Sequence, residues 1–179
     1  LHPIKLMDGF TASVSHGTQT FCLDQADTFT NYPFANRHQF LVKEAGLEVE
    51  RLQFVPDGKE GMTILFRIKN LESTQKTIQF QFDAFVDLMP VWLGERTQMI
   101  DQPDKISFDT TTSTFSAKDQ GNPWFTVWGT KEGLLPKPTQ DVNCNYSPKG
   151  KGTASGFRVE LKLTGGSEQV VPVFIAGSA

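Results

Sequence analysis

The amino-acid sequence predicts an all-β fold, a two-layer antiparallel β-sandwich of the supersandwich-like kind, and three observations predict it. Apolar and polar residues alternate along several segments, so that each strand turns one side to a core and the other to water. Turn-forming residues separate these segments. The 179 residues also include 15 Phe against 2 Tyr and 3 Trp, and Phe favours the half-buried surface of a sheet.

Four segments carry the clearest strand pattern. In residues 62–69 every second side chain from Met62 onwards is apolar, and residues 77–86 repeat the pattern after a short polar hairpin connection. Residues 156–163 alternate in the same way, and two glycines then turn the chain into residues 169–176. Strands that are buried on one side and wet on the other favour antiparallel pairing.

Weaker patterns predict five further strands, and no segment longer than two turns has helical spacing. These strands are residues 39–43, 47–55, 105–109, 114–117 and 124–129. Many short strands with turns between them are typical of a sandwich or barrel. We therefore expect residues 1–179 to form a single β-sandwich domain.

The composition argues against two classes of partner. The net charge is −3, and the longest basic cluster, residues 149–151, is too small for a nucleic-acid footprint. No apolar run approaches the roughly 18–20 residues that a membrane helix needs. We expect neither a nucleic acid nor a membrane as partner, and nothing at the start resembles a signal peptide.

The two cysteines, Cys22 and Cys144, lie far apart in the sequence. They have no CxxC spacing and no nearby pair of histidines, which argues against a zinc site. We expect two buried free thiols, with a disulfide as the alternative, because sequence spacing does not decide pairing. We expect no metal ion and no other cofactor.

The three histidines, His2, His16 and His38, lie outside any known catalytic or metal-binding motif. We interpret His38 as a hydrogen-bonded structural residue near the start of a strand. The chain also lacks a nucleophile elbow, a phosphate-binding glycine loop and a dinucleotide fingerprint. We therefore assign no catalytic residue and expect no activity from this chain alone.

Two long connections stand out, residues 87–104 and residues 129–155. Long connections in a compact domain are often functional or mobile. We expect the first to be ordered, because its apolar residues need burial, and the second to be mobile at residues 149–152. The candidate site lies in the first connection and consists of Trp92, Glu95, Arg96 and Asp101.

This candidate site has the composition of a carbohydrate-binding or domain-interface surface. Aromatic faces stack on the apolar C–H faces of sugar rings, while carboxylates and guanidinium groups bind the hydroxyls. Trp92 has three interpretations: packing against a partner domain, sugar contact, or ordinary core. Glu95 and Asp101 form either a carboxylate pair for glycoside hydrolysis or surface ion pairs, for example with Arg96.

Other aromatic residues have structural interpretations. Trp124 and Trp128 are four positions apart, so on a strand they share a face, and we expect both in the core. A second aromatic cluster is interpreted as the anchor of a loop: Phe29, Tyr32, Pro33 and Phe34.

A family resemblance covers residues 39–179. The sequence contains FANRHQFLVKEAGLEVERLQFVPDGKEGMTILFRIKNLESTQKTIQFQF, in which the matching residues are Val49, Arg51, Phe54, Val55, Pro56 and 63–70. Residues 78–85 then lead into a loop with the letters VWLG, and VVPVFIAGSA closes the chain like a last sandwich strand. This order of elements resembles the β-sandwich that precedes the (α/α)6 barrel in bacterial glucosidase- and glycogen-debranching-like glycoside hydrolases.

The resemblance implies a non-catalytic N-terminal accessory domain, a fragment of a larger glycoside hydrolase. Such a domain braces the catalytic (α/α)6 barrel of the same polypeptide and contributes a loop to substrate binding, so an oligo- or polysaccharide is a further partner. In that family the catalytic carboxylates lie in the barrel, so none is transferred to this chain. The family also implies a periplasmic or extracellular protein, with the cytoplasm as the alternative.

Three other functions stay open: a free-standing carbohydrate-binding module, a structural or adhesion sandwich, and a small hydrolase that uses Glu95 and Asp101. The accessory-domain hypothesis predicts an exposed apolar patch on the 87–104 connection. The binding-module hypothesis predicts a shallow groove of exposed aromatic rings.

Overall fold

The structure is a computed structural model that describes residues 4–91, 96, 98–131, 134–147 and 152–178. The described elements are β-strands and a short 3-10 helix. In chain order these are β1 (Ile4–Lys5), β2 (Gly9–His16), β3 (Gln19–Cys22), β4 (Thr28–Asn31), β5 (Ala35–Val42), η1 (Lys43–Ala45), β6 (Leu47–Phe54), β7 (Gly61–Asn70), β8 (Lys76–Val86), β9 (Met89–Pro90), β10 (Asp104–Asp109), β11 (Thr114–Asp119), β12 (Phe125–Thr130), β13 (Lys137–Thr139), β14 (Thr153–Leu163) and β15 (Glu168–Ser178). Among the described residues, no helix is long and apolar enough to cross a membrane.

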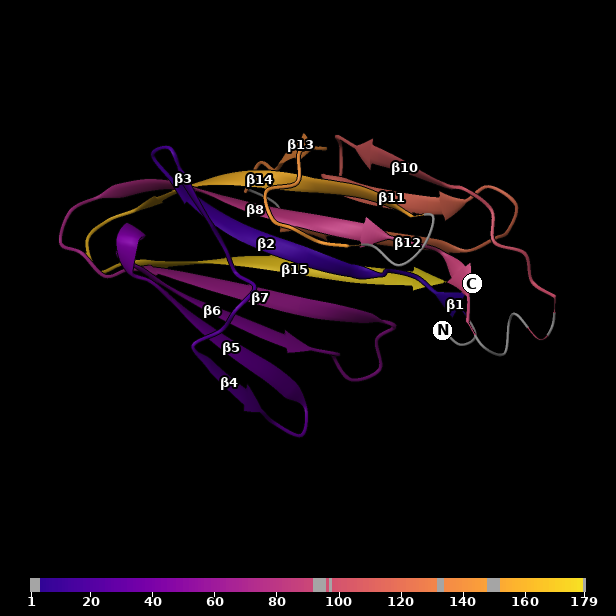
Figure 1. The fold of residues 1–179 in the computed structure, drawn as a ribbon, viewed down its shortest axis with the longest axis horizontal. Coiled ribbons are helices and arrows are strands. Elements are labelled where there is room, and N and C mark those ends of the chain that lie inside the picture. Colours follow the sequence, from indigo (N-terminus) through magenta and orange to yellow (C-terminus); the bar gives the residue numbers. More distant parts are fainter. Residues whose placement is uncertain (1–3, 92–95, 97, 132–133, 148–151, 179) are drawn as a thin grey trace.

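Two sheets stack face to face, as Figure 1 shows. The larger sheet has the strand order β10-β11-β12-β15-β7-β6-β5-β4, and the smaller has the order β13-β14-β8-β2-β3. Neighbouring strands pair antiparallel, including the separate ribbon of β1 and β9. The predicted all-β, two-layer antiparallel sandwich is confirmed. Because the larger sheet has more strands, β4 and β5 extend past the smaller sheet (Figure 1).

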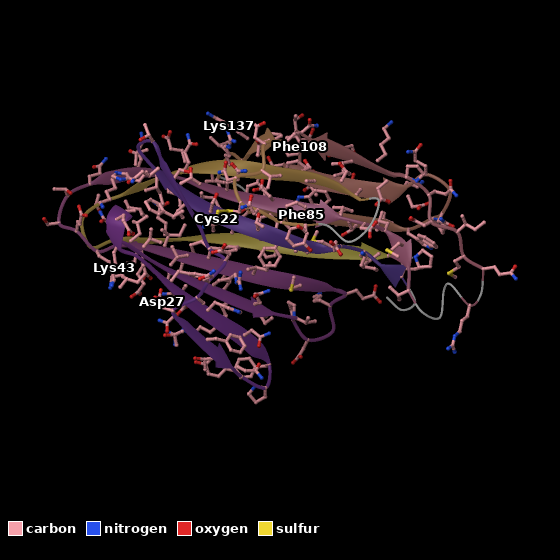
Figure 2. All side chains as sticks on the ribbon, in the orientation of Figure 1. Cys22, Asp27, Lys43, Phe85, Phe108 and Lys137 are labelled. Carbon is pink, nitrogen blue, oxygen red and sulfur yellow. A yellow bond between two sulfur atoms is a disulfide. The ribbon has the colours of Figure 1, made fainter. Side chains whose placement is uncertain are left out.

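The core lies between the two sheets, where side chains fill the space (Figure 2). Phe66 of β7, Phe80 of β8 and Phe157 of β14 are each 0% exposed. The ring centroids of Phe66 and Phe80 lie 4.9 Å apart across the interface between the sheets. Each buried Phe stabilises the fold by about 1.5–3 kcal/mol relative to an exposed one, so the alternation seen in the sequence supplies the main folding energy.

The predicted strands are all present. Strong alternation corresponds to β7, β8, β14 and β15, and weaker patterns correspond to β5, β6, β10, β11 and β12. The predicted burial of Trp124 and Trp128 is also confirmed, at 4% and 1% exposure. The sequence pattern missed β2, β3, β4 and β13, which are rich in small and polar residues, and the two-residue strands β1 and β9. Residues 149–151, expected to be mobile, lie outside the described residues.

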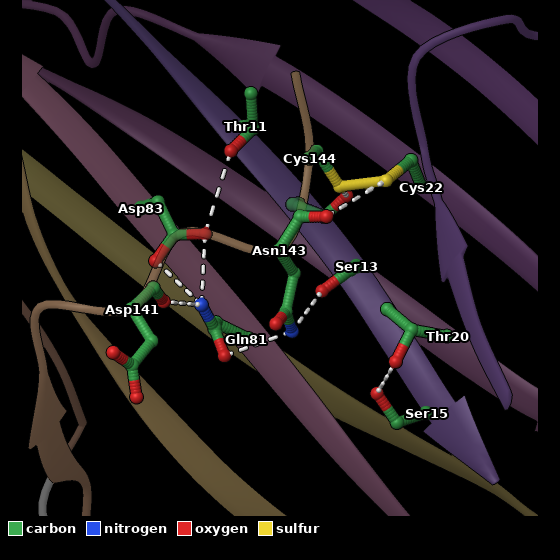
Figure 3. The surroundings of a disulfide bond; sticks show 11 residues. Thr11, Ser13, Ser15, Thr20, Cys22, Gln81, Asp83, Asp141, Asn143 and Cys144 are labelled. Atoms are coloured by element: carbon green, nitrogen blue, oxygen red, sulfur yellow. Dashed lines mark hydrogen bonds between the residues drawn. A yellow bond between two sulfur atoms is a disulfide. The ribbon is translucent and has the colours of Figure 1, made fainter. Parts of the chain in front are cut away.

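The two cysteines form a disulfide, so the prediction of two free thiols is wrong. Cys22 ends β3, at the edge of the smaller sheet, and Cys144 lies in residues 140–147, which we call the strap. The strap crosses the outer face of the smaller sheet and brings the two Cα atoms to 5.7 Å (Figure 3), a separation that suits a disulfide. The pairing depends on β3 and the strap, neither of which the sequence pattern revealed.

A buried polar network lies beneath the strap (Figure 3). The side-chain amide nitrogen of Gln81 donates to both carboxylate oxygens of Asp83, at 2.8 and 2.9 Å, and to the backbone carbonyl of Asp141 at 2.6 Å. The amide oxygen of Gln81 accepts from Asn143 at 2.9 Å and from Arg158 at 2.6 Å. Gln81 and Asp83 are both 1% exposed. Because both polar atoms of the Gln81 side chain are bonded, the network stabilises the strap on the sheet.

Candidate functional site

The structure separates the four predicted site residues into two groups. Trp92 and Glu95 lie outside the described residues, so their role stays a prediction. Arg96 is exposed and Asp101 is half-buried. Burial is the largest cause that raises the pKa of Asp104 to about 6, and the charges of Asp119, Asp87 and Asp101 add to it.

The connection between residues 87 and 104 is only partly buried. Leu88 and Pro90 are buried, where β9 pairs with β1. Met99 and Ile100, however, are 39% and 67% exposed. The expectation that the apolar residues of this connection are buried is therefore wrong at these two positions, because they follow the ribbon and do not reach the core.

The aromatic cluster at residues 29–34 forms a hairpin that the sequence pattern did not predict. Phe29 lies in β4, and the turn between β4 and β5 is closed by two backbone hydrogen bonds between Tyr32 and Ala35. Phe29 is 58% exposed and Phe34 is 77% exposed. The rings of Tyr32 and Phe34 stack at 6.0 Å between centroids. Of the residues interpreted as a loop anchor, Tyr32 closes the turn, whereas Phe29 and Phe34 face water and do not anchor the loop by burial.

The hairpin also carries a row of side chains that runs across four strands. Phe29 of β4 pairs with His38 of β5, His38 pairs with Arg51 of β6, and Arg51 pairs with Phe66 of β7. Directly paired residues point to the same side of a sheet, and Phe66 points into the core. The row therefore lies on the inward side of the larger sheet and leads from the core to exposed Phe29.

A second row lies beside the first and is mainly polar. Asn31 pairs with Asn36, Asn36 pairs with Gln53, and Gln53 pairs with the core residue Ile64. These positions are two residues along each strand from the first row, so their side chains lie on the same face. Together the two rows form what we call the polar platform, which consists of Phe29, Asn31, Asn36, His38, Arg51 and Gln53.

Arg51 holds a charge at the open edge of the sandwich. Its guanidinium carbon lies 5.5 Å from the ring centroid of Phe10, on β2 of the smaller sheet, and 5.6 Å from that of Phe40. Its Nε atom is buried without a hydrogen-bond partner. Burial lowers the pKa of the guanidinium below its ordinary value, yet Arg side chains remain charged in proteins. No described carboxylate forms an ion pair with Arg51.

His38 lies beside Arg51, and one of its ring nitrogens also has no hydrogen-bond partner among the described residues. Its ring packs on Phe29 at 4.8 Å between centroids, and its Nδ1 atom is buried without a hydrogen bond among the described residues. Burial, and then the charge of Arg51, lower the pKa of the imidazole below 6.5. The prediction of a hydrogen-bonded histidine near a strand start is therefore wrong, because His38 lies in the middle of β5.

The composition of the platform defines what it can bind. Asn and Gln amides donate and accept hydrogen bonds, and the exposed face of Phe29 offers an apolar surface. No described acidic side chain belongs to its two rows. In the part of the chain that the structure describes, no three His, Cys, Asp or Glu residues are placed to hold a metal ion. The platform can thus bind a polar ring without metal ligands from the described residues.

One sequence signal pointed to this platform. In β6 the inward positions read Val49, Arg51 and Gln53, so two polar residues occupy positions where alternation predicts apolar ones. The sequence pattern alone did not show which residues lie beside them, because β4 was not predicted. The strand register supplied that information.

Sequence comparisons assign no family to this chain. No protein-family model matches it. No curated protein matches it either.

Comparisons with solved structures show similar folds. A protein assigned as a kojibiose phosphorylase, from the human microbiome, has a TM-score of 0.55 and 10% identity over 93% of this chain and 21% of that one. A polysaccharide lyase has a TM-score of 0.53 and 10% identity over 96% of this chain and 25% of that one. A protein assigned as an aldose 1-epimerase, from Klebsiella pneumoniae, has a TM-score of 0.50 and 9% identity over 83% and 52%.

The likeness is one of fold. At 9–10% identity it establishes the β-sandwich and no residue role. The chain spans between 21% and 52% of the length of these proteins.

Proposed function

We propose that this chain is a carbohydrate-binding accessory β-sandwich of a carbohydrate-active enzyme. In this role it binds a glycan on the polar platform and braces a catalytic (α/α)6 barrel of the same polypeptide, where the chemistry takes place. The observation that carries the proposal is the platform itself. Proteins of similar fold that are described as acting on sugars give it context.

The platform has the two kinds of surface that a sugar ring needs. Phe29 presents an exposed aromatic face for the C–H side of the ring. Asn31, Asn36 and Gln53 present amides in one row for the hydroxyl groups. Because these residues lie on adjacent strands of one sheet, their positions are fixed before a ligand binds, which lowers the entropic cost of association.

The bracing role has separate support. Met99 and Ile100 are exposed apolar side chains on the connection that was predicted to face a partner domain. The reading frame that follows Ala179 in the gene tests the bracing role, because a catalytic barrel requires a few hundred further residues with helical spacing.

Isothermal titration calorimetry of the isolated chain with a panel of neutral and acidic oligosaccharides tests the binding role. We expect measurable binding of at least one glycan, and Phe29→Ala should weaken it about tenfold, because a lost stacking contact costs about 1.4 kcal/mol. Phe174→Ala is the matched control, since Phe174 is also an exposed Phe, at 47% exposure, but lies on β15. Absence of heat with every glycan from a folded chain would refute the binding role.

The compartment stays a prediction. The Cys22–Cys144 disulfide supports the periplasmic or extracellular alternative over the cytoplasmic one, because disulfides persist in oxidising compartments. Alkylation of unreduced protein from its native cells tests this: modification of both thiols would contradict it.

A further inference from the structure

Arg51 differs from the arginines on the two neighbouring strands, because it has no ion pair with a described carboxylate. On the outer side of the same strands, Arg37 pairs with Glu50 at 2.6 Å, and Arg67 pairs with Glu50 at 3.8 Å and with Glu168 at 2.8 Å. On the inward side, the charged group of Arg51 lies over the faces of Phe10 and Phe40 and forms no ion pair with a described carboxylate. The arginine charges on the outer side are therefore paired with carboxylates of the protein, whereas the charge of Arg51 on the platform is not paired with a described carboxylate.

A half-buried guanidinium without a counter-ion favours an anionic ligand. Desolvation weakens the hydration of the charge, and the nearby aromatic rings replace only part of it. The planar guanidinium fork matches a carboxylate in geometry, and the ion pair gains strength in a partly desolvated site. His38 adds no negative charge beside it, and neither do the amides of Asn36 and Gln53.

Resting on the proposed glycan-binding function, we propose that the polar platform recognises an acidic glycan, one whose sugar units carry a carboxylate. The carboxylate of a uronic acid unit pairs with Arg51, and the ring of that unit or its neighbour stacks on Phe29. The amides of Asn36 and Gln53 bind the hydroxyl groups. Phe29, His38 and Arg51 are adjacent in one row, so one or two sugar units span them.

Paired ligands that differ in charge alone test the inference. Trimers of galacturonate, glucuronate and mannuronate are titrated by calorimetry as free acids and as fully methyl-esterified forms. At least one free acid should bind about tenfold more tightly than its ester, and the preference should shrink as salt is added. Equal affinities for every acid and its ester would overturn the inference, while leaving glycan binding itself supported.

Matched variants locate the preference. Arg51→Met keeps a long apolar side chain without the charge, so the free acid and its ester should bind this variant with nearly equal affinity. Arg67→Met is the control on the outer side and should leave both affinities as in the parent chain. If Arg51→Met fails to fold, Arg51→Lys keeps the charge without the fork and should lower the preference only in part.

The outcomes separate this inference from the proposed function. A preference for acid that survives in folded Arg51→Met overturns the inference alone. Binding of neutral glycans without binding of any uronate does the same. A chain that binds neither charged nor neutral glycans overturns both.

Discussion

The molecule carries two polar clusters, and they differ in how their atoms are satisfied. Beneath the strap, Gln81 is 1% exposed and both its polar atoms are hydrogen-bonded. On the polar platform, Arg51 and His38 each have a buried nitrogen without a partner. Natural proteins leave few buried polar atoms unpaired. The first cluster is satisfied by the fold itself, whereas the second has nitrogens, unpaired among the described residues, that the proposed ligand would contact.

We call the network beneath the strap the closed cluster and the polar platform the open cluster. The topology explains this difference in exposure. The network lies on the smaller sheet and is covered by the strap, which the Cys22–Cys144 disulfide ties to β3 (Figure 3). The platform lies on β4, β5 and β6, at the end of the larger sheet that extends past its partner sheet (Figure 1). The strap therefore closes the first cluster, while the greater width of the larger sheet leaves the second one open.

Removing the disulfide should produce the largest effect, and only on the closed cluster. It joins residues that are 122 positions apart, and cross-links that close such long loops contribute about 3–4 kcal/mol to the free energy of unfolding. We expect the Cys22→Ser, Cys144→Ser double variant to lose about that much in urea denaturation. Glycan affinity at the platform should not change. A loss below about 1 kcal/mol would mean that the network alone holds the strap.

An intermediate effect on the free energy of unfolding should come from the titration of Asp83 in the closed cluster. Burial, the largest cause, raises the pKa of Asp83, against hydrogen bonds from Gln81, Asn143 and Thr11 that lower it. Because the folded-state pKa lies above the unfolded value near 3.8, the native state binds more protons, and stability falls as pH rises from that value through the raised pKa. Asp83→Asn should flatten this slope and leave the protein at least as stable at neutral pH, because it removes the charge that burial disfavours.

Urea denaturation of the two proteins across mildly acidic to neutral pH checks this sign. Asp109→Asn is a suitable control, because two hydrogen bonds, from Thr111 and Thr112, lower the pKa of that exposed carboxyl. Its removal should leave the slope in this pH range unchanged, because a carboxyl with a lowered pKa titrates below about 3.8. If Asp83→Asn leaves the slope as steep as in the parent chain, Asp83 is not the group that titrates.

The sequence predicted the parts of the fold in which local and tertiary signals agree. In β7, large apolar residues alternate with polar ones, so both periodicity and burial identify the strand. In β2, the letters GFTASVSH offer mostly small side chains, and tertiary pairing with β8 decides the structure instead. Helical spacing was absent from both, which is why the fold class was predictable even where strands were missed.

The candidate site was less predictable than the fold, for a physical reason. Phe29, His38 and Arg51 are 9 and 13 positions apart in sequence and become neighbours only through strand register. An exposed aromatic ring and a buried one look alike in a sequence, so the cluster at residues 29–34 gave no sign of facing water. The Cys22–Cys144 pairing was hidden in the same way, since it joins two segments that lack alternation.

The smallest expected effect on stability comes from Arg51→Met in the open cluster. Arg158→Met in the closed cluster is the comparison. Arg158 donates to the amide oxygen of Gln81 at 2.6 Å, so Arg158→Met removes a hydrogen bond from a charged group, leaves that oxygen with Asn143 alone, and should destabilise the fold by about 1–2 kcal/mol. Arg51→Met removes two cation–π contacts, each worth between about 0.5 kcal/mol when exposed and about 2 kcal/mol when desolvated, but it also removes a charge that is costly to bury. The two terms oppose each other, so we expect a change of less than about 1 kcal/mol in urea denaturation. If Arg51→Met lowers the free energy of unfolding as much as Arg158→Met does, Arg51 serves the fold. Its unpaired charge would then no longer support a ligand site on the platform.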